Sequence, residues 1–142
     1  MRKLIFIGFV AALVLSAAAL PGVASARNSS WTADANKVCV IWLAKAKKQF
    51  AVPVKPSGLL KFAVASRTLE TQELAALEKI PNASPAGTHA LVAVRADIAE
   101  ISAAINAGNR GDSATFVKIL KQYLNDHRAK AAFAAAGASQ CG

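Results

Sequence analysis

Hydrophobic residues recur at helical spacing in four stretches of the chain, each repeating apolar side chains every three or four positions. These stretches span about residues 32–50, 58–80, 88–107 and 113–136. Ser30 or Thr32 is a candidate N-cap of the first stretch, and Asp112 or Ser113 of the fourth. No stretch shows the strict alternation of a strand, and the connections are short, so neighbouring helices should run antiparallel. The pattern predicts an all-α protein, a compact up-down-up-down four-helix bundle.

A different pattern precedes these stretches and is typical of a secretory signal peptide. Met1–Lys3 is basic, Leu4–Leu20 carries no charge, and Ala24–Ala26 offers an A-x-A cleavage site. Residues 1–26 are therefore predicted to be a signal peptide and 27–142 a single helical domain that is secreted or held in the cell envelope. An uncleaved anchor is the alternative, because the apolar run is long for a signal core. No later apolar run approaches the roughly 20 residues that span a bilayer.

The two cysteines, Cys39 and Cys141, lie near the two ends of the predicted domain. In an exported protein an even pair of cysteines indicates a disulfide, and two cysteines allow one intramolecular pairing. The two cysteines and two histidines do not have zinc-finger spacing, so no metal site is expected. We therefore expect a Cys39–Cys141 bridge that closes a small, alanine-rich core with few aromatic residues.

Four polar residues fall on or beside the predicted apolar stripes and form a candidate polar core cluster: Glu73, Arg95, Tyr123 and His127. Buried charges are costly unless paired, so these groups should meet each other or water. Such a cluster could be a ligand pocket or simply a satisfied structural network. Tyr123 and His127, four residues apart, could also ligate haem iron, but there is no Cys-x-x-Cys-His motif and little spare apolar surface. No cofactor is expected.

No nucleophile elbow, phosphate-binding loop or zinc-protease motif occurs, and nothing nominates a catalytic residue, so the chain is not expected to be an enzyme.

The chain has 17 basic and 8 acidic residues, a formal charge of +9. The basic residues concentrate towards both ends of the predicted domain, which the disulfide should hold together. The candidate contacts to anionic surfaces are Lys45, Lys47, Lys48, Lys55, Lys118, Lys121 and Lys130. A solvated face that keeps the protein soluble is the alternative interpretation.

Several segments together resemble small exported alanine-rich helical proteins of high-GC Gram-positive bacteria. The matching pieces are Asp34–Cys39, the turn over Asn106–Asp112, and the ending Gly137–Gly142. The resemblance implies a helical fold and a disulfide but no chemistry, since such proteins have no established activity. The leucine usual before the final Cys-Gly is missing here, where Gln140 stands instead.

Two functional hypotheses follow. The first is a non-enzymatic secreted or envelope protein that associates with an anionic wall polymer, a lipid surface or a protein partner. The second is a carrier that holds a small apolar ligand between its helices. Specific nucleic-acid recognition is not expected, because basic and aromatic residues do not interleave in a recognition motif.

Overall fold

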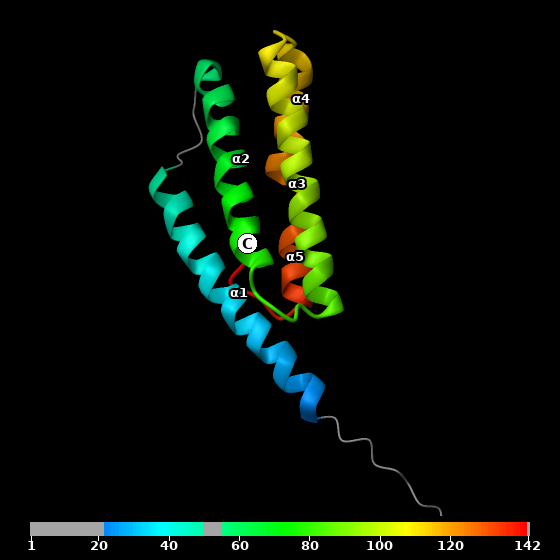
Figure 1. Ribbon diagram of the computed structural model, residues 1–142. Helices are drawn as coiled ribbons and strands as arrows, with labels where there is room; N and C mark the ends of the chain where they lie inside the picture. The colour runs from blue at the N-terminus through cyan, green and yellow to red at the C-terminus, as the bar shows by residue number, and fades with distance from the viewer. Residues whose placement is uncertain (1–21, 50–54, 142) are drawn as a thin grey trace, which may run out of the picture.

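The computed structural model describes residues 22–49 and 55–141, and within these residues the regular structure is entirely helical. The helices are α1 Gly22–Gln49, α2 Pro56–Glu78, α3 Pro85–Asn109, α4 Ser113–Asn125 and α5 Arg128–Ala135. Helices α1 to α4 alternate in direction, and α5 continues along α3 in the direction of α4 (Figure 1). The prediction of an all-α, up-down-up-down bundle closed by one disulfide is confirmed.

The predicted fourth stretch is interrupted, and this break matters for the site. Asp126 adopts an extended conformation, with a ψ of 132°, and its side chain accepts a hydrogen bond from the Arg128 backbone N–H at 2.8 Å. An aspartate that bonds the backbone two residues on competes with helical hydrogen bonding. The fourth arm of the bundle therefore consists of α4 and α5, with a turn at Asp126 and His127.

The first helix begins earlier than the apolar pattern indicated. It starts at Gly22, so the prediction that Ser30 or Thr32 caps it is wrong. Thr32 instead donates its hydroxyl to the Ala136 carbonyl at 3.1 Å, which ties α1 to the end of α5. Most of the predicted signal peptide, residues 1–21, lies outside the described residues, and its cleavage stays a prediction.

The ends of α3 and α4 follow the sequence signals closely. Ser84 accepts a hydrogen bond from the Gly87 N–H, and Pro85 occupies the first turn of α3. Asp112 caps α4 by accepting from the Thr115 N–H at 3.0 Å, as one of the two predicted candidates. Gly111 precedes this cap with a φ of 78°, a conformation that favours glycine.

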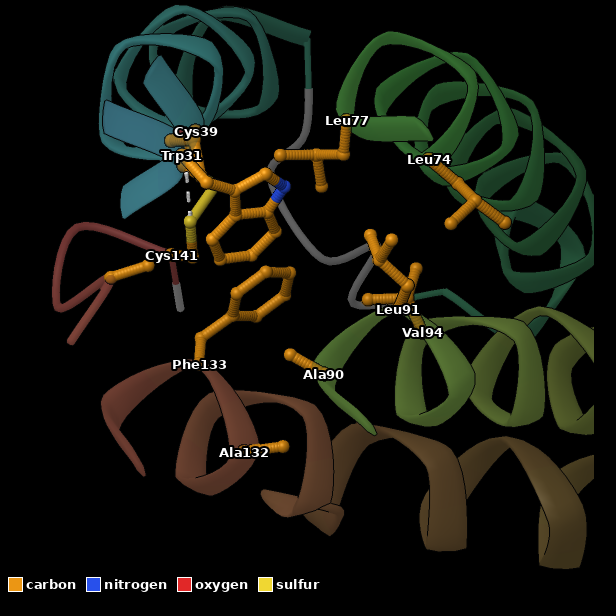
Figure 2. Packing of buried hydrophobic residues seen from close by; sticks show 12 residues of the cluster. Trp31, Cys39, Leu74, Leu77, Ala90, Leu91, Val94, Ala132, Phe133 and Cys141 are labelled. Carbon is orange, nitrogen blue, oxygen red and sulfur yellow. Dashed lines mark hydrogen bonds between the residues drawn. A yellow bond between two sulfur atoms is a disulfide. The ribbon is translucent and has the colours of Figure 1, made fainter. Parts of the chain in front are cut away.

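The first part of the core surrounds the Cys39–Cys141 disulfide, which is present as predicted. Its Cα atoms are 4.9 Å apart, and the bridge spans 102 positions of sequence. The Trp31 indole is 1% exposed and lies near the bridge and the Phe133 ring (Figure 2). A Cβ atom on Gly87 would come within 2.9 Å of that indole, so a larger residue would force the ring to move. We call this group the disulfide cluster, and α1, α2, α3 and α5 all contribute to it.

The second part of the core lies at the other end of the bundle and is built from α2, α3 and α4. Its buried members are Phe62, Ala63, Ile101, Ala104, Ile105, Ala107, Phe116 and Leu120. We call it the Phe116 cluster. No residue of the described part of α1 belongs to it, so α1 is held chiefly by α2 and the disulfide cluster. Among the described residues, no helix is long and apolar enough to cross a membrane.

Candidate functional site

A layer of charged and polar side chains separates the two apolar clusters, at the level where α4 gives way to α5. Its members are Glu70 and Glu73 from α2, Asp97 and Glu100 from α3, Tyr123 from α4, Asp126 from the turn, and Arg128 from α5. We call this group the polar layer. It contains five of the eight carboxylates in the whole chain, which concentrates acid inside a strongly basic protein.

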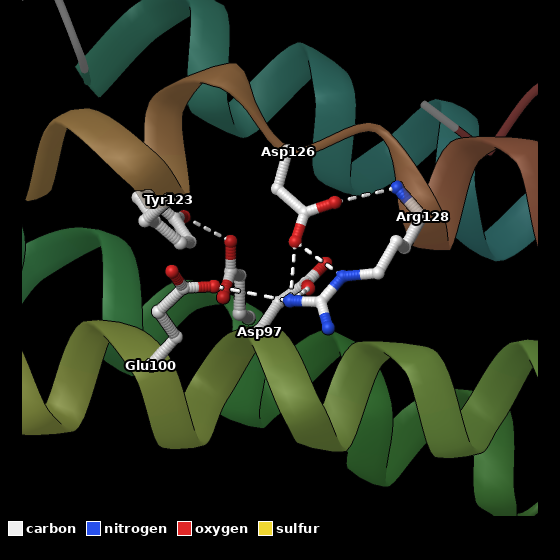
Figure 3. A network of polar contacts seen from close by, with 6 residues as sticks. Asp97, Glu100, Tyr123, Asp126 and Arg128 are labelled. Atoms are coloured by element: carbon white, nitrogen blue, oxygen red, sulfur yellow. Dashed lines mark hydrogen bonds and ion pairs between the residues drawn. The ribbon is translucent and has the colours of Figure 1, made fainter. Parts of the chain in front are cut away.

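Arg128 gathers one half of the polar layer. Its guanidinium lies 3.1 Å from Glu100 and 3.9 Å from Asp97, and it also pairs with Asp126 (Figure 3). The arginine side chain is 62% exposed, whereas the Asp97 side chain is only 15% exposed. Oxygens of Asp97, Glu100 and Asp126 come within 4.8 Å of one another, as in a metal site. The guanidinium already supplies the positive charge that this trio of carboxylates attracts.

Tyr123 organises the other half of the layer. Its hydroxyl donates a short hydrogen bond to Glu70 across the α2–α4 contact. Glu73 lies one turn further along α2 and repels Glu70 electrostatically. No cation lies within salt-bridge distance of Glu70 or Glu73 in the part of the chain that the structure describes. The two glutamates are therefore partly desolvated without a compensating charge.

Burial changes the protonation of these carboxylates. Burial raises the pKa of Glu70 to about 7, although the hydrogen bond from Tyr123 partly opposes the change. Burial, with repulsion from Glu70, raises the pKa of Glu73 to about 7. Burial and repulsion from Asp126 raise the pKa of Asp97 to about 6, against the attraction of Arg128. Burial and the nearby Glu70 also raise the pKa of Tyr123, so its hydroxyl keeps its proton and acts as a donor. Glu70 and Glu73 are therefore the members of the layer whose pKa values lie near neutral pH.

Two cavities adjoin the polar layer, and Glu70 and Glu73 line both. The first, about 150 Å³, lies towards the disulfide cluster and is bounded also by Asp97, Lys130 and Phe133. The second, about 210 Å³, lies between α1, α2 and α4, with walls that include Trp42, Leu43, Leu69 and Tyr123. Ligand pockets usually enclose roughly 300 Å³ or more, so both spaces are small.

No protein-family model, curated protein or solved structure shows a significant match to this chain. The resemblance to small exported alanine-rich proteins therefore stays a prediction.

The predicted polar core cluster does not form as a unit. His127 is exposed, because the break after α4 removes it from the apolar stripe that would have buried it. Arg95 lies on the outer side of α3 and pairs with Glu78 at 2.7 Å. Tyr123 and Glu73 do belong to the polar layer, but Tyr123 bonds Glu70 and not His127. The four-residue Tyr123–His127 spacing that suggested haem ligation is thus not helical spacing in the structure.

The polar layer has members that the sequence interpretation missed: Glu70, Asp97, Glu100, Asp126 and Arg128. A signal for two of them was present. Asp97 falls three residues after the buried Val94 and four before the buried Ile101, and Glu70 falls between the buried Ser66 and Leu74. Both therefore occupy inward positions of their helices. Asp126 and Arg128 carried no such signal, because their placement depends on the helix break.

Most exposed basic residues lie in the half of the molecule that holds the Phe116 cluster (Figure 1). This half runs from the level of the polar layer, where Lys45 lines a pocket with Thr68 and Leu69 of α2, to the end of α3 and the beginnings of α2 and α4. Eight exposed side chains contribute: Lys45, Lys47, Lys48, Lys55, Lys61, Arg110, Lys118 and Lys121. We call this the basic end. Asp112 is its only carboxylate among the described residues, and its side chain caps α4. Six of the seven lysines proposed from sequence lie here, whereas Lys130 lines the cavity beside the polar layer.

The expected cause of this clustering, the disulfide, is wrong. The disulfide does not bring the basic segments together, since it lies in the opposite half of the bundle; the alternation of helix directions does so. The lysines of α1 also do not share one arc. Lys45 and Lys47 are separated by about 200° of helical rotation. Lys45 instead lies over the Trp42 ring, 3.5 Å from its centroid.

Proposed function

We propose that this chain is a non-enzymatic exported helical protein that associates with anionic surfaces outside the cell, such as wall polymers or lipid head groups. The observation that supports the proposal is the segregation of charge. Five of the eight carboxylates lie in the polar layer, and the other three are Asp34, Glu78 and Asp112. Asp34 pairs with Lys37, Glu78 pairs with Arg95, and Asp112 caps α4. The surface therefore presents many lysines and few carboxylates that could neutralise them.

The disulfide supports the exported location, because such bridges persist in oxidising compartments outside the cytoplasm. The basic end supports the partner class, because a surface rich in exposed lysines and poor in carboxylates attracts anions, and salt screens that attraction. Lysine ammonium groups bind anions as point charges, so binding should be insensitive to the stereochemistry of the anion. A protein partner with an acidic surface would satisfy the same charge requirement.

Replacement of two lysines of the basic end should weaken this association strongly. Each lysine near an anionic membrane contributes about 1 kcal/mol, so Lys48→Gln with Lys121→Gln should bind about 25-fold more weakly. The measurement is retention on phosphatidylglycerol vesicles and on isolated anionic wall polymer at low salt, and then at rising salt.

The matched control carries Lys79→Gln and Lys130→Gln, which change the net charge equally but lie away from the basic end. It should bind within about threefold of the unmodified protein. Equal weakening in both variants would show that net charge alone matters. Retention that does not respond to salt would contradict the proposal.

The carrier of a small apolar ligand is the second candidate function, and the cavity beside Trp42 and Tyr123 favours it. Its support is weaker, because that cavity is small and two glutamates line it. Native mass spectrometry of the exported protein, with an absorption spectrum, tests the carrier directly. A co-purifying apolar ligand whose retention falls on Leu69→Ala would favour the carrier over surface association.

A further inference from the structure

The outer face of α1 combines exposed aliphatic side chains with lysines. Val40 and Ile41 are 50% and 56% exposed, and the exposed Ala44 lies one turn further along, between them. Lys47 and Lys48 follow Val40 and Ile41 by seven residues, which is two helical turns, so both lie on the same face. We call Val40, Ile41, Ala44, Lys47 and Lys48 the outer face of α1.

This face is turned away from the rest of the bundle. Trp31, Ala35 and Cys39 bury the opposite side of α1 within the disulfide cluster. The packing of α1 on α2 leaves its other side at the edge of the molecule (Figure 1). Lys37, at the near end of the face, is neutralised by Asp34 at 2.8 Å. The positive charge therefore lies at the far end, where the face runs into the basic end.

We propose that the outer face of α1 binds the surface of an anionic lipid bilayer, with Val40 and Ile41 inserted below the head groups. Lys47 and Lys48 would then meet the lipid phosphates while their stems follow the apolar surface. This proposal rests on the proposed function and names its partner. A helix with an apolar strip beside lysines is suited to the boundary between acyl chains and anionic head groups.

Charge and chemistry select this occupant over two others. A second copy of the chain would gain little here, because two half-exposed aliphatic side chains per copy offer far less than the roughly 800 Å² per partner that a stable interface buries. A hydrophilic wall polymer offers phosphates to the lysines but no hydrocarbon to Val40 and Ile41. An anionic leaflet offers both a negative surface and an apolar interior.

The test uses the chain purified after export, with its N-terminus defined by mass spectrometry, on vesicles of phosphatidylcholine with 30% phosphatidylglycerol. Val40→Ser with Ile41→Ser should weaken co-sedimentation about tenfold, since two half-exposed aliphatic side chains lose their transfer into the bilayer. The same variant should bind wall polymer unchanged. The control, Val64→Ser with Val92→Ser, replaces exposed valines of α2 and α3 and should bind vesicles like the unmodified protein.

Insertion has a direct signature. In Ile41→Trp, acyl chains carrying bromine should quench the added fluorescence, whereas in Val92→Trp they should not. Thermal unfolding of each variant establishes that it folds.

The outcomes separate this inference from the proposed function. Vesicle binding that is unchanged in Val40→Ser/Ile41→Ser overturns the inference. Binding to wall polymer without binding to vesicles also overturns the inference but leaves the proposed function standing. Loss of a dimer in the double variant, measured by sedimentation, would assign the face to a second copy instead. Absence of binding to both materials contradicts both proposals.

Discussion

Removal of the Cys39–Cys141 disulfide is expected to lower the free energy of unfolding by about 4–5 kcal/mol. The bridge spans 102 positions, and in the chain-entropy model the closure of a loop of about 100 residues contributes about 4.7 kcal/mol. The native contacts add to this expectation. The bridge joins α1 to the C-terminal segment inside the disulfide cluster, and α1 has no part in the Phe116 cluster.

Two hydrogen bonds also join α1 to the C-terminal segment and depend on the same disulfide. Asn36 accepts a hydrogen bond from the Gln140 backbone N–H at 2.9 Å, and Thr32 donates to Ala136 at 3.1 Å. Both contacts connect residues 104 positions apart, so without the bridge each would have to offset the closure of a long loop. We therefore expect α1 to separate from the bundle before the remaining helices unfold.

The measurement is denaturant unfolding of the oxidised protein and of Cys39→Ser/Cys141→Ser, followed by circular dichroism and by tryptophan fluorescence. Fluorescence reports Trp31 and Trp42, both in α1, and should change at lower denaturant in the serine variant. Reductant should destabilise the unmodified protein and leave the serine variant unaffected. If the serine variant lost less than about 1 kcal/mol in its free energy of unfolding, packing alone would be shown to hold α1 in place.

Glu73→Gln is expected to stabilise the protein at pH 8 by about 2–3 kcal/mol and to have little effect at pH 4. Burial raises the pKa of Glu73 from 4.5 to about 7, so the folded protein holds this proton more tightly than the unfolded chain. Between those two values the folded state binds more protons, and stability falls as pH rises. A pKa difference of one unit corresponds to 1.36 kcal/mol, so ionisation of Glu73 lowers the free energy of unfolding by about 3 kcal/mol. Nearly all of this loss has occurred once the pH exceeds about 7.

The neutral amide of glutamine keeps the shape of the side chain and removes the charge. The experiment is the free energy of unfolding from pH 4 to pH 8 for the unmodified protein and for Glu73→Gln. The control is Glu78→Gln, on the same helix, whose carboxylate is exposed and paired with Arg95. That exposed pair should contribute less than about 1 kcal/mol to the free energy of unfolding. A pH profile of Glu73→Gln that coincides with that of the unmodified protein would contradict the assigned burial of charge.

The polar layer and the basic end have a common physical origin. A chain with 8 carboxylates and 17 basic residues would show a mixed surface if its acids were dispersed. The fold instead places five acids between the two apolar clusters, where burial and repulsion from neighbouring carboxylates raise the pKa values of Glu70, Glu73 and Asp97. The cost in stability at neutral pH accompanies a gain in positive surface charge, which the proposed function uses.

The sequence alone determined the helical class, the number of bundle arms, the disulfide and, as one of two neighbouring candidates, the cap at Asp112. These features depend on local periodicity, turn chemistry and a pairing with one possible outcome, so they need no knowledge of long-range contacts. Local reasoning failed at Asp126, where a side-chain hydrogen bond to Arg128 ended a helix whose apolar pattern continued. That break moved His127 to the surface and out of the predicted cluster. Arg95 is missing from the cluster for a separate reason, because it lies on the outer side of α3 and pairs with Glu78.

Only the tertiary structure decided which charged residues meet. Glu70 and Tyr123 are 53 positions apart, and Arg128 reaches Glu100 across 28, so neither contact has a periodic signature. The lysines of α1 and α4 likewise share one half of the bundle because the helices alternate in direction, not because of the disulfide. Charge can be counted along a chain, but its position inside or outside a bundle depends on how helical faces are rotated against one another, and packing of the whole core determines that rotation.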